Sequence, residues 1–185
     1  DFTIGVLSLK FDQIYHEHVS YFTARNIKSI LDFSNLKILS LSKNKYHGGS
    51  LRTIVSKKSS SLKKFKIDKF INYENKKNIY KLDFYKKMMK RINIKKKKLL
   101  DKLNNLSNKG YIISGIGAGA KSNTFLTFYG LNYKIIKFLT DSSKFKKNKY
   151  TPVSRIIIKD DKELISYKKI ACIILSWNIS SLIID

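Results

Sequence analysis

The chain has 185 residues and carries 38 Lys and Arg side chains against 13 Asp and Glu, which gives a formal net charge of +25 at pH 7. Hydrophobic residues make up 43% of it, which argues against a disordered chain, and no apolar run approaches the roughly 18 residues of a membrane span. The single cysteine, Cys172, excludes a disulfide framework and a cysteine-built zinc site. We therefore expect a soluble cytoplasmic protein without a membrane partner.

Short elements are predicted for the first third of the chain. Residues 2–9 have the apolar composition of a strand, and residues 23–33 have helical spacing with Thr23 as the N-cap. Residues 36–41 and 50–55 have the β-rich composition of two further strands. Two adjacent glycines between these strands permit a turn with positive φ.

A lysine-rich segment and a long helix follow. Residues 56–77 carry few apolar side chains and are predicted to be a linker. Apolar side chains spaced by three, four or seven residues from Leu82 to Leu106 then predict a long helix, which Gly110 ends. The lysine tract at 95–98 has no interleaved aromatic side chains that would stack bases, so we interpret it as the solvated face of this helix.

After Gly110 the pattern changes to strands that alternate with helices. Such alternation predicts a parallel, Rossmann-like sheet. The predicted segments are a strand at 111–114, a glycine loop at 115–124, a helix that ends near Gly130, a strand at 135–140, a short helix near 162–167 and a strand at 171–175. A doubly wound sheet normally continues beyond this point, and the chain starts without Met, so we expect a fragment cut at both ends.

The segment YHEHVSY, residues 15–21, gathers two imidazoles, a carboxylate and two phenols. Imidazoles titrate near neutral pH, so this density favours acid–base chemistry. In an extended conformation His16 and His18 would share one face, with Tyr15 and Glu17 on the other. The alternatives are a metal site that includes the third histidine of the chain, or a structural loop whose histidines cap backbone groups.

Two glycine-containing segments are the other candidate sites. In HGGSLR the paired glycines allow a ligand close to the backbone, and His47 and Ser50 add polar contacts; the alternative is a plain β-turn. In the glycine loop, G-x-G-x-x-A spacing followed by Asp141 at the end of the next strand is the dinucleotide-binding pattern, and Lys121 could meet a phosphate. Here the alternative is a tight strand-to-helix turn that binds nothing.

Taken in order, five segments resemble the C-terminal half of sugar C-methyltransferases that depend on S-adenosylmethionine (SAM) and act on nucleotide-linked deoxy-ketosugars. These segments are FDQIYHEHVSYF, HGGSLR, GIGAGAKSNT, DSSKFKKNKYTP and LSWN, and the resemblance covers essentially the whole chain. It implies an α/β fold in which the end of a SAM-methyltransferase sheet is followed by a long helix and a Rossmann-like parallel-sheet domain. The corresponding parts are residues 1–58, 59–109 and 110–185.

The resemblance also implies roles for individual residues. In such an enzyme a base removes the acidic proton next to a sugar ketone, and the carbon then attacks the SAM methyl group; the matching base is His18. Glu17 would orient that histidine or hold a sugar hydroxyl, and Tyr15 would line the sugar pocket. The implied substrate contacts are His16, His47, Ser50, Lys121 and Asn123, with no metal ligand in this chain.

Cofactors and partners follow from the same resemblance. SAM would bind mainly outside this chain, and zinc would belong to a cysteine-rich N-terminal module that the sequence does not contain. The implied partners are a nucleotide-linked sugar and a separately encoded N-terminal half. Two residues depart from the pattern, because Ser122 and Val153 stand where the family commonly has glycine.

Two other functions stay open. A Rossmann-type nucleotide-binding module without catalysis would rest on the glycine loop and Asp141. A nucleic-acid binder would rest on the charge, but 34 of the 38 basic residues are lysine rather than arginine, which is the bidentate reader of phosphate and guanine. Residues with A/T-rich codons (Lys, Ile, Asn, Phe and Tyr) form more than half of the chain, so we interpret most of the charge as solvated background and expect no nucleic-acid partner.

Overall fold

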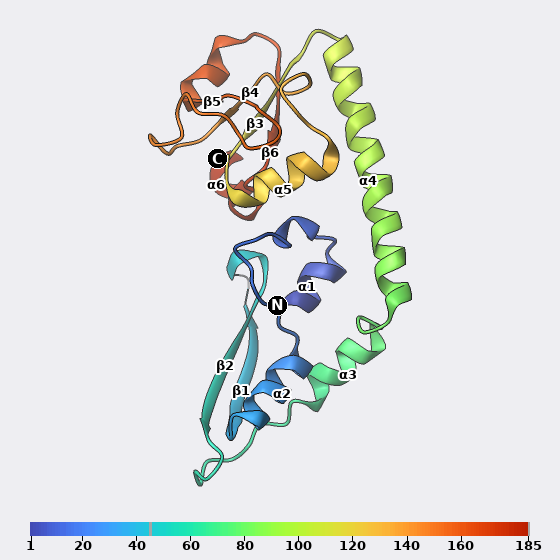
Figure 1. Cartoon of the computed structure of the whole chain (residues 1–185), viewed down its shortest axis with the longest axis vertical. Helices are drawn as coiled ribbons and strands as arrows, with labels where there is room; N and C mark the ends of the chain where they lie inside the picture. The colour runs from blue at the N-terminus through green and yellow to red at the C-terminus, as the bar shows by residue number, and fades with distance from the viewer. Residues whose placement is uncertain (45, 185) are drawn as a thin grey trace. The chain divides into compact units, whose positions relative to one another are not determined.

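Helices and strands are mixed throughout the computed structural model of the chain (Figure 1). The structure describes residues 1–44 and 46–184, and for residues 47, 181 and 182 it describes the backbone alone. Within these described ranges, no helix is both long enough and apolar enough to cross a membrane.

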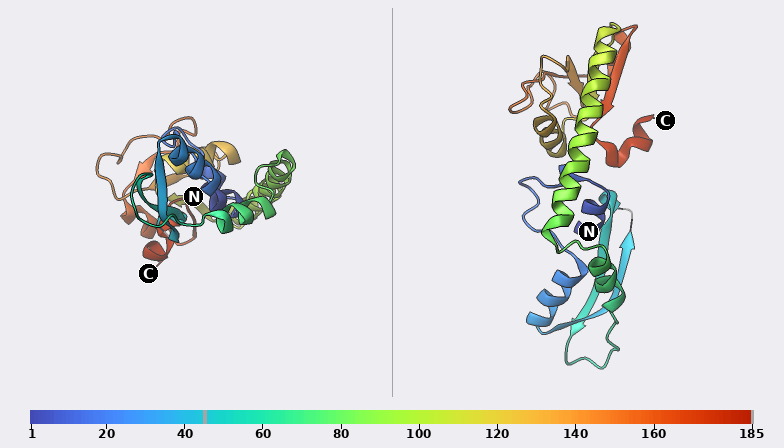
Figure 2. Two further views of the ribbon diagram at one scale, coloured as in Figure 1. Left: turned by 90° about the horizontal axis from the view of Figure 1, so that it is seen from below. Right: turned by 90° about the vertical axis from the view of Figure 1, so that its right-hand side faces the viewer.

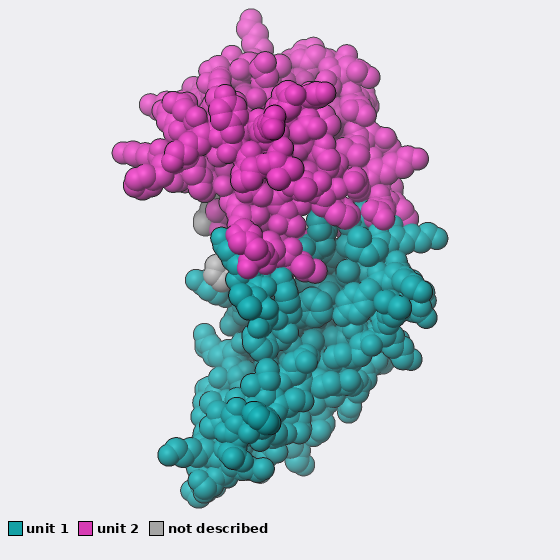
Figure 3. Space-filling view, viewed as in Figure 1, with its two compact units in different colours: residues 1–11, 17–92 teal, residues 12–16, 93–185 magenta. Residues whose placement is uncertain are grey.

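The chain divides into two compact units, which Figure 3 colours separately. Unit 1 comprises Asp1–Phe11 and Glu17–Ile92, and unit 2 comprises Asp12–His16 and Asn93–Asp185. The chain therefore passes between the units three times. One of these passages falls inside the YHEH segment, between its second and third residues.

Unit 1 combines a two-stranded ribbon with helices. Its elements are α1 (Phe2–Leu7), α2 (Ala24–Phe33), β1 (Leu36–Asn44), the 3₁₀ turn η2 (Tyr46–Gly48), β2 (Ser50–Lys57), α3 (Asp68–Lys76) and the first part of α4 (Leu82–Asn108). Strands β1 and β2 pair antiparallel, and α2 lies along this ribbon (Figures 1 and 2). The core between them is apolar, with Ala24, Ile38, Leu41 and Ile67 at its centre.

Several predictions for unit 1 are confirmed. The helix predicted at 23–33 is α2, and the hydroxyl of its N-cap Thr23 accepts a hydrogen bond from the Asn26 N–H at 3.2 Å. The two strands predicted around the paired glycines are β1 and β2. Gly48 and Gly49 have the expected positive φ, of 80° and 125°. A Cβ on Gly49 would lie 2.8 Å from Ile4 Cγ2, so this turn also needs glycine for a close approach to α1.

Two predictions for unit 1 are wrong. The strand predicted at 2–9 is the helix α1, because the Asp1 carboxylate accepts a hydrogen bond from the Thr3 N–H at 2.9 Å and caps the first turn. The linker predicted at 56–77 contains α3 in its second half. Its polar composition hid this helix, because Phe70 and Ile71 are the side chains with which α3 packs against the core.

Unit 2 contains the predicted parallel sheet. Its elements are the end of α4, β3 (Ile112–Ile116), α5 (Ala120–Tyr129), β4 (Phe138–Thr140), β5 (Ile158–Lys159), the 3₁₀ helix η3 (Asp161–Ser166), β6 (Ile170–Ile174), the 3₁₀ turn η4 (Trp177–Ile179) and α6 (Ser180–Ile184). The strand order is β5-β4-β3-β6, and every neighbouring pair is parallel. The Rossmann-like prediction is therefore confirmed, although β5 was missed because it is only two residues long.

The core of unit 2 lies around the sheet and α5. Leu126, Ile136, Phe138, Leu139 and Ile156 are completely buried. The long helix predicted before the sheet is α4, and Gly110 has φ of 79° just after its end, as predicted. Near its middle, Lys96 Nζ donates to the carbonyl of Phe128 at 2.6 Å, so the ammonium group of a lysine on α4 also contacts the C-terminal end of α5.

A loop before β5 holds an exposed side chain in a glycine-like conformation. Val153 has φ of 62° and is 79% exposed, at the position where the family resemblance leads us to expect glycine. A β-branched residue in the left-handed region costs about 1–3 kcal/mol. The valine side chain is solvated, so little packing compensates this cost.

Val153→Gly should therefore stabilise the chain. Relief of the strain exceeds the added entropy of the unfolded glycine, and we expect the free energy of unfolding to rise by about 1 kcal/mol. Chemical denaturation monitored by circular dichroism measures this change. The matched control is Val19→Gly, at a 91% exposed valine without positive φ, which should destabilise the chain slightly. Equal losses in both variants would contradict the strain argument.

Candidate active site

The segment YHEHVSY lies in the loop between α1 and α2. After the single 3₁₀ turn η1 (Phe11–Gln13) the backbone bends at residues 15–17 and has no regular structure up to Thr23. The prediction that His16 and His18 share the face of an extended segment is therefore wrong. The bend breaks the alternation of side chains that an extended backbone imposes.

The ends of this loop are fixed within unit 1. The Phe2 N–H donates to the carbonyl of Phe22 at 3.0 Å, and Lys10 Nζ donates to the carbonyl of Gly48 at 2.7 Å. The rings of Phe2 and Tyr21 lie edge to face with their centroids 5.5 Å apart. The loop between α1 and α2, residues 8–23, is called the motif loop below. It is thereby bound at one end to the HGG turn at residues 47–49 and at the other end to α1.

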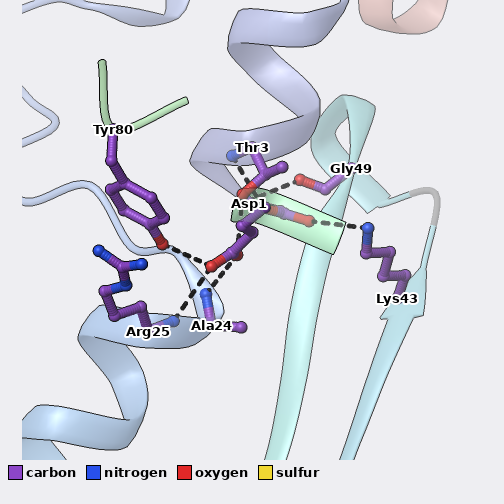
Figure 4. Close-up of polar contacts among 8 residues, drawn as sticks. Asp1, Thr3, Ala24, Arg25, Lys43, Gly49 and Tyr80 are labelled. Atoms are coloured by element: carbon purple, nitrogen blue, oxygen red, sulfur yellow. Dashed lines mark hydrogen bonds and ion pairs between the residues drawn. The ribbon is translucent and has the colours of Figure 1, made fainter. Parts of the chain in front are cut away.

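A buried carboxylate joins α1 and α2 to α3, and Figure 4 labels its partners Thr3, Ala24, Arg25 and Tyr80. Glu74, on α3, is 3% exposed. Its Oε1 accepts hydrogen bonds from Thr3 Oγ1 at 3.0 Å and the Ala24 N–H at 2.7 Å, and its Oε2 from the Arg25 N–H at 3.2 Å and the Tyr80 hydroxyl at 2.5 Å. The two N–H groups belong to the first turn of α2, where a helix has unpaired donors and partial positive charge. Glu74 thus fixes the place where the motif loop enters α2.

Tyr80 completes this arrangement. Its hydroxyl lies 2.9 Å from Thr23 Oγ1, and the Arg25 guanidinium lies 3.7 Å from the centroid of its ring. Burial of the phenol, together with its hydrogen bond to the Glu74 carboxylate, raises the pKa of Tyr80 to about 12. The phenol therefore stays protonated and continues to donate to Glu74 well above neutral pH.

Two of the three predicted catalytic side chains are exposed on this loop, whereas Tyr15 is half-buried. His18 and Glu17 lie in unit 1 and are open to solvent, and the His18 imidazole lies edge to face with Tyr21, with ring centroids 6.2 Å apart. Tyr15 and His16 belong to unit 2, and their ring centroids are 6.1 Å apart. Among the described residues no group of three His, Cys, Asp or Glu could hold a metal ion.

Three of the sequence motifs meet inside unit 2. Trp177, from LSWN, donates a hydrogen bond from Nε1 to the carboxylate of Asp12, which is 5% exposed and comes from FDQIYHEH. Lys121, from the glycine-loop segment, has its Nζ 5.7 Å from the centroid of the Trp177 ring. Sequence reasoning did not select Asp12 or Trp177 as site residues. The signal was available, because the only tryptophan of the chain and an acidic residue both lie inside the family motifs.

The predicted substrate contacts fall into two groups. Lys121 and Asn123 lie on α5 in unit 2, and the buried Asn123 Oδ1 has no hydrogen-bond partner within the described ranges. Ser50 lies in unit 1, where it lines a cavity of about 440 Å³ that Phe22, at the end of the motif loop, also lines. The side chain of His47 lies outside the described residues.

The glycine loop between β3 and α5 is bonded internally. The Gly117 N–H donates to the carbonyl of Thr140 at 2.8 Å, and the Ala118 N–H donates to Asp141 Oδ2 at 2.9 Å. Gly117 has φ of 95°, and a Cβ there would lie 2.0 Å from Ser176 Oγ, so neighbouring chain fills the space beside this glycine. These two donors are unavailable for a pyrophosphate, which weakens the dinucleotide-binding interpretation.

Asp141 is likewise committed to its own loop. It accepts from the Ala118 and Ser143 N–H groups and from Lys146 Nζ, the last at 2.9 Å. Burial acts to raise the pKa of Asp141, but the hydrogen bonds from Ala118, Lys146 and Ser143 outweigh it and hold that pKa below its usual value. The carboxylate that would bind a ribose in a dinucleotide site is thus occupied. Asp141 and the N–H groups of Gly117 and Ala118 therefore give no support to SAM or a dinucleotide at this loop.

Tyr80→Phe tests the hydrogen bond between Tyr80 and Glu74. Removing the hydroxyl should lower the free energy of unfolding by about 1 kcal/mol at pH 8. The folded-state pKa is raised, so this contribution is complete below the unfolded pKa near 10 and is lost as pH rises toward about 12. Urea unfolding at pH 8, 10 and 11.5 should show that the difference in free energy of unfolding between wild type and variant becomes smaller as pH rises.

The control is Tyr133→Phe, at an exposed tyrosine, which should not change the free energy of unfolding. A difference for Tyr80→Phe that stays constant from pH 8 to 11.5 would contradict the assignment.

Two comparisons identify the family. The C-methyltransferase C-terminal domain family matches residues 45–185. The C-methyltransferase NovU of Streptomyces niveus is 24% identical to this chain over 177 residues, which are 95% of this chain and 42% of NovU. The chain thus spans less than half the length of this curated relative. The family match includes the HGG turn, the glycine loop and the Trp177 segment, and it covers most of the sequence, so the chain belongs to the C-methyltransferase C-terminal domain family.

Proposed function

We propose that this chain is the part of a C-methyltransferase that holds the catalytic base and contacts a nucleotide-linked deoxy-ketosugar. The observation that carries the proposal is the exposed imidazole of His18 on a loop whose ends are bound to α1, α2 and the HGG turn. A general base must be reachable by its substrate and yet held in place. The motif loop meets both requirements.

The chemistry assigned to this chain is a proton transfer. His18 removes a proton from the carbon next to the sugar ketone, and the electron pair left on that carbon is delocalised onto the ketone oxygen as an enolate. This carbon then forms its bond to the transferred methyl group as the bond from that group to its donor sulfur breaks, with the electron pair left on the sulfur and the proton left on the imidazole. Glu17 orients the imidazole or accepts a hydrogen bond from a sugar hydroxyl, while Tyr15 and His16 line the sugar pocket. An imidazole suits this role, because one ring nitrogen can accept the proton while the other keeps an N–H for an orienting hydrogen bond.

S-adenosylmethionine supplies the methyl group in this proposal, and we place its binding residues outside the chain. The occupied donors of the glycine loop and the committed Asp141 carboxylate support this placement. A domain that binds SAM must therefore act together with this chain, on the same polypeptide or on a partner. Zinc in a cysteine-rich module, the location in the cytoplasm and the nucleotide carrier of the sugar belong to the same proposal.

The two other functions have less support. A nucleotide-binding module without catalysis needs N–H groups at the glycine loop that the structure uses internally. A nucleic-acid binder rests on the net charge, most of which is carried by lysine. Neither accounts for the family match or for the meeting of three motifs around Trp177.

His18→Asn tests the assignment of the base. In the protein that unites this chain with its SAM-binding domain, the variant should lower kcat for methyl transfer by about 100-fold or more while KM changes little. Transfer of a ¹³C-methyl group from SAM to a nucleotide-linked deoxy-ketosugar measures the first effect. Incorporation of solvent deuterium next to the ketone, without SAM, measures proton removal directly and should also be lost.

The matched control is Val19→Ala, the next residue of the loop, which is 91% exposed and should keep kcat within about twofold. If the His18→Asn protein still exchanged deuterium at the wild-type rate, another group would be the base. If both variants lost activity equally, the loop itself rather than the imidazole would carry the effect.

A further inference from the structure

A cavity of about 670 Å³ opens beside β5, the edge strand of the sheet in unit 2. Its lining consists of three cationic side chains, two tyrosines and one isoleucine: Tyr133, Lys137, Tyr150, Arg155, Ile157 and Lys159. Lys137 and Ile157 come just before β4 and β5, and Lys159 is the last residue of β5, so the cavity lies along this edge strand. None of its lining residues is among those assigned to methyl transfer.

The loop that presents Arg155 is built rigidly. The Thr151 N–H donates to the carbonyl of Ile156 at 2.9 Å, and the Ile156 N–H donates back to Thr151 Oγ1 at 2.9 Å. The hydroxyls of Thr151 and Ser154 lie 2.6 Å apart, and both residues are 4% exposed. The Arg155 N–H donates to the carbonyl of Thr151 at 3.1 Å and holds Arg155 at φ of 52°. Left-handed non-glycine residues concentrate at functional sites, because the surrounding structure must hold them there.

The two tyrosines are attached to the same framework. Tyr150 forms an antiparallel bridge with Ile157, so their side chains lie on one face of the sheet, and Lys159, two residues further, shares that face. The Tyr133 N–H donates to the carbonyl of Ser154 at 3.1 Å. Tyr133 is 56% exposed and Tyr150 is 64% exposed, so their rings are available to a ligand.

The charges of the lining match a dianion. Lys159 donates to Glu163 Oε1 at 2.6 Å, so its charge is already compensated. Lys137 and Arg155 have no ion pair or side-chain hydrogen bond within the described residues, and the lining contains no acidic side chain. A phosphate monoester carries about −1.5 to −2 charges at pH 7, and a guanidinium binds it through two parallel hydrogen bonds. Arginine is rare in this lysine-rich chain, so the lysine-rich composition alone does not explain why an arginine, Arg155, lines the cavity.

We propose that this cavity binds a small phosphate monoester whose body is a planar ring, with Arg155 and Lys137 on the phosphate and Tyr133 and Tyr150 against the ring. Aromatic side chains stack on planar rings, and cationic side chains supply the charge. This site goes beyond the methyl transfer proposed above. A nucleotide-linked sugar has no terminal phosphate monoester, so the site is also distinct from a subsite for that substrate.

Calorimetric titration of the chain tests the proposal. Uridine 5′-monophosphate should bind at least about tenfold more tightly than inorganic phosphate, ribose 5-phosphate, uridine or a uridine diphosphate sugar. Arg155→Ala and Tyr150→Ala should each weaken its binding about tenfold or more, whereas Tyr150→Phe, which keeps the ring, should not. Both residues are exposed, so circular dichroism spectra of the variants should match wild type.

The charge control is Lys134→Ala, which removes one positive charge from an exposed position outside the lining and should change the affinity less than twofold. An equal effect of Lys134→Ala and Arg155→Ala would overturn the proposal, because binding would then depend on net charge alone. Equal affinity for inorganic phosphate would exclude the ring contact. Equal affinity for the uridine diphosphate sugar would make the cavity a substrate subsite instead.

Discussion

Water stabilises a carboxylate so strongly that burying one costs several kcal/mol unless charge-assisted hydrogen bonds replace the hydration shell. In unit 1 that replacement is complete, since Glu74 receives bonds from α1, from the first turn of α2 and from Tyr80. Hydrogen bonds are directional, so the Glu74 carboxylate fixes the relative positions of the groups that donate to it more closely than apolar contacts would. It thereby also fixes the ends of the motif loop, which enter α1 and α2.

Unit 2 uses the same device at two further carboxylates. Asp141 holds the glycine loop through the Ala118 N–H, and Asp12 holds Trp177 through its indole N–H. In both cases a carboxylate that could bind a ligand is instead hydrogen-bonded to a neighbouring part of the chain. Among the proposed site residues, His18 in unit 1 is exposed and Lys121 on α5 in unit 2 is half-buried. The carboxylates thus hold the structure in both units, and the proposed substrate contacts come from other side chains.

The sequence predicts those features that local periodicity or single residues determine. Helix α2 has its cap at Thr23, and the parallel sheet follows from alternating elements, so both were predicted. The helix α1 was not predicted, because a short, mostly apolar segment has the composition of a strand as much as of a helix until the capping contact of Asp1 is known. The partners of Glu74 lie up to 71 positions away in the sequence, and no local pattern announces such a contact. The family resemblance assigned roles to His18 and Lys121, whereas the contact between Asp12 and Trp177 became visible only in the fold.

The threefold passage of the chain between the units also constrains how the gene can recombine. Asp12 and Trp177 are 165 positions apart in the sequence, and the whole of the second stretch of unit 1, Glu17–Ile92, lies between them. A crossover between two related genes anywhere in that stretch would join the acidic residue of one parent to the indole of the other. A chimera of two family members therefore keeps this hydrogen bond only where both parents have the acidic residue and the tryptophan. We therefore expect Asp12 and Trp177 to be retained or lost together during evolution.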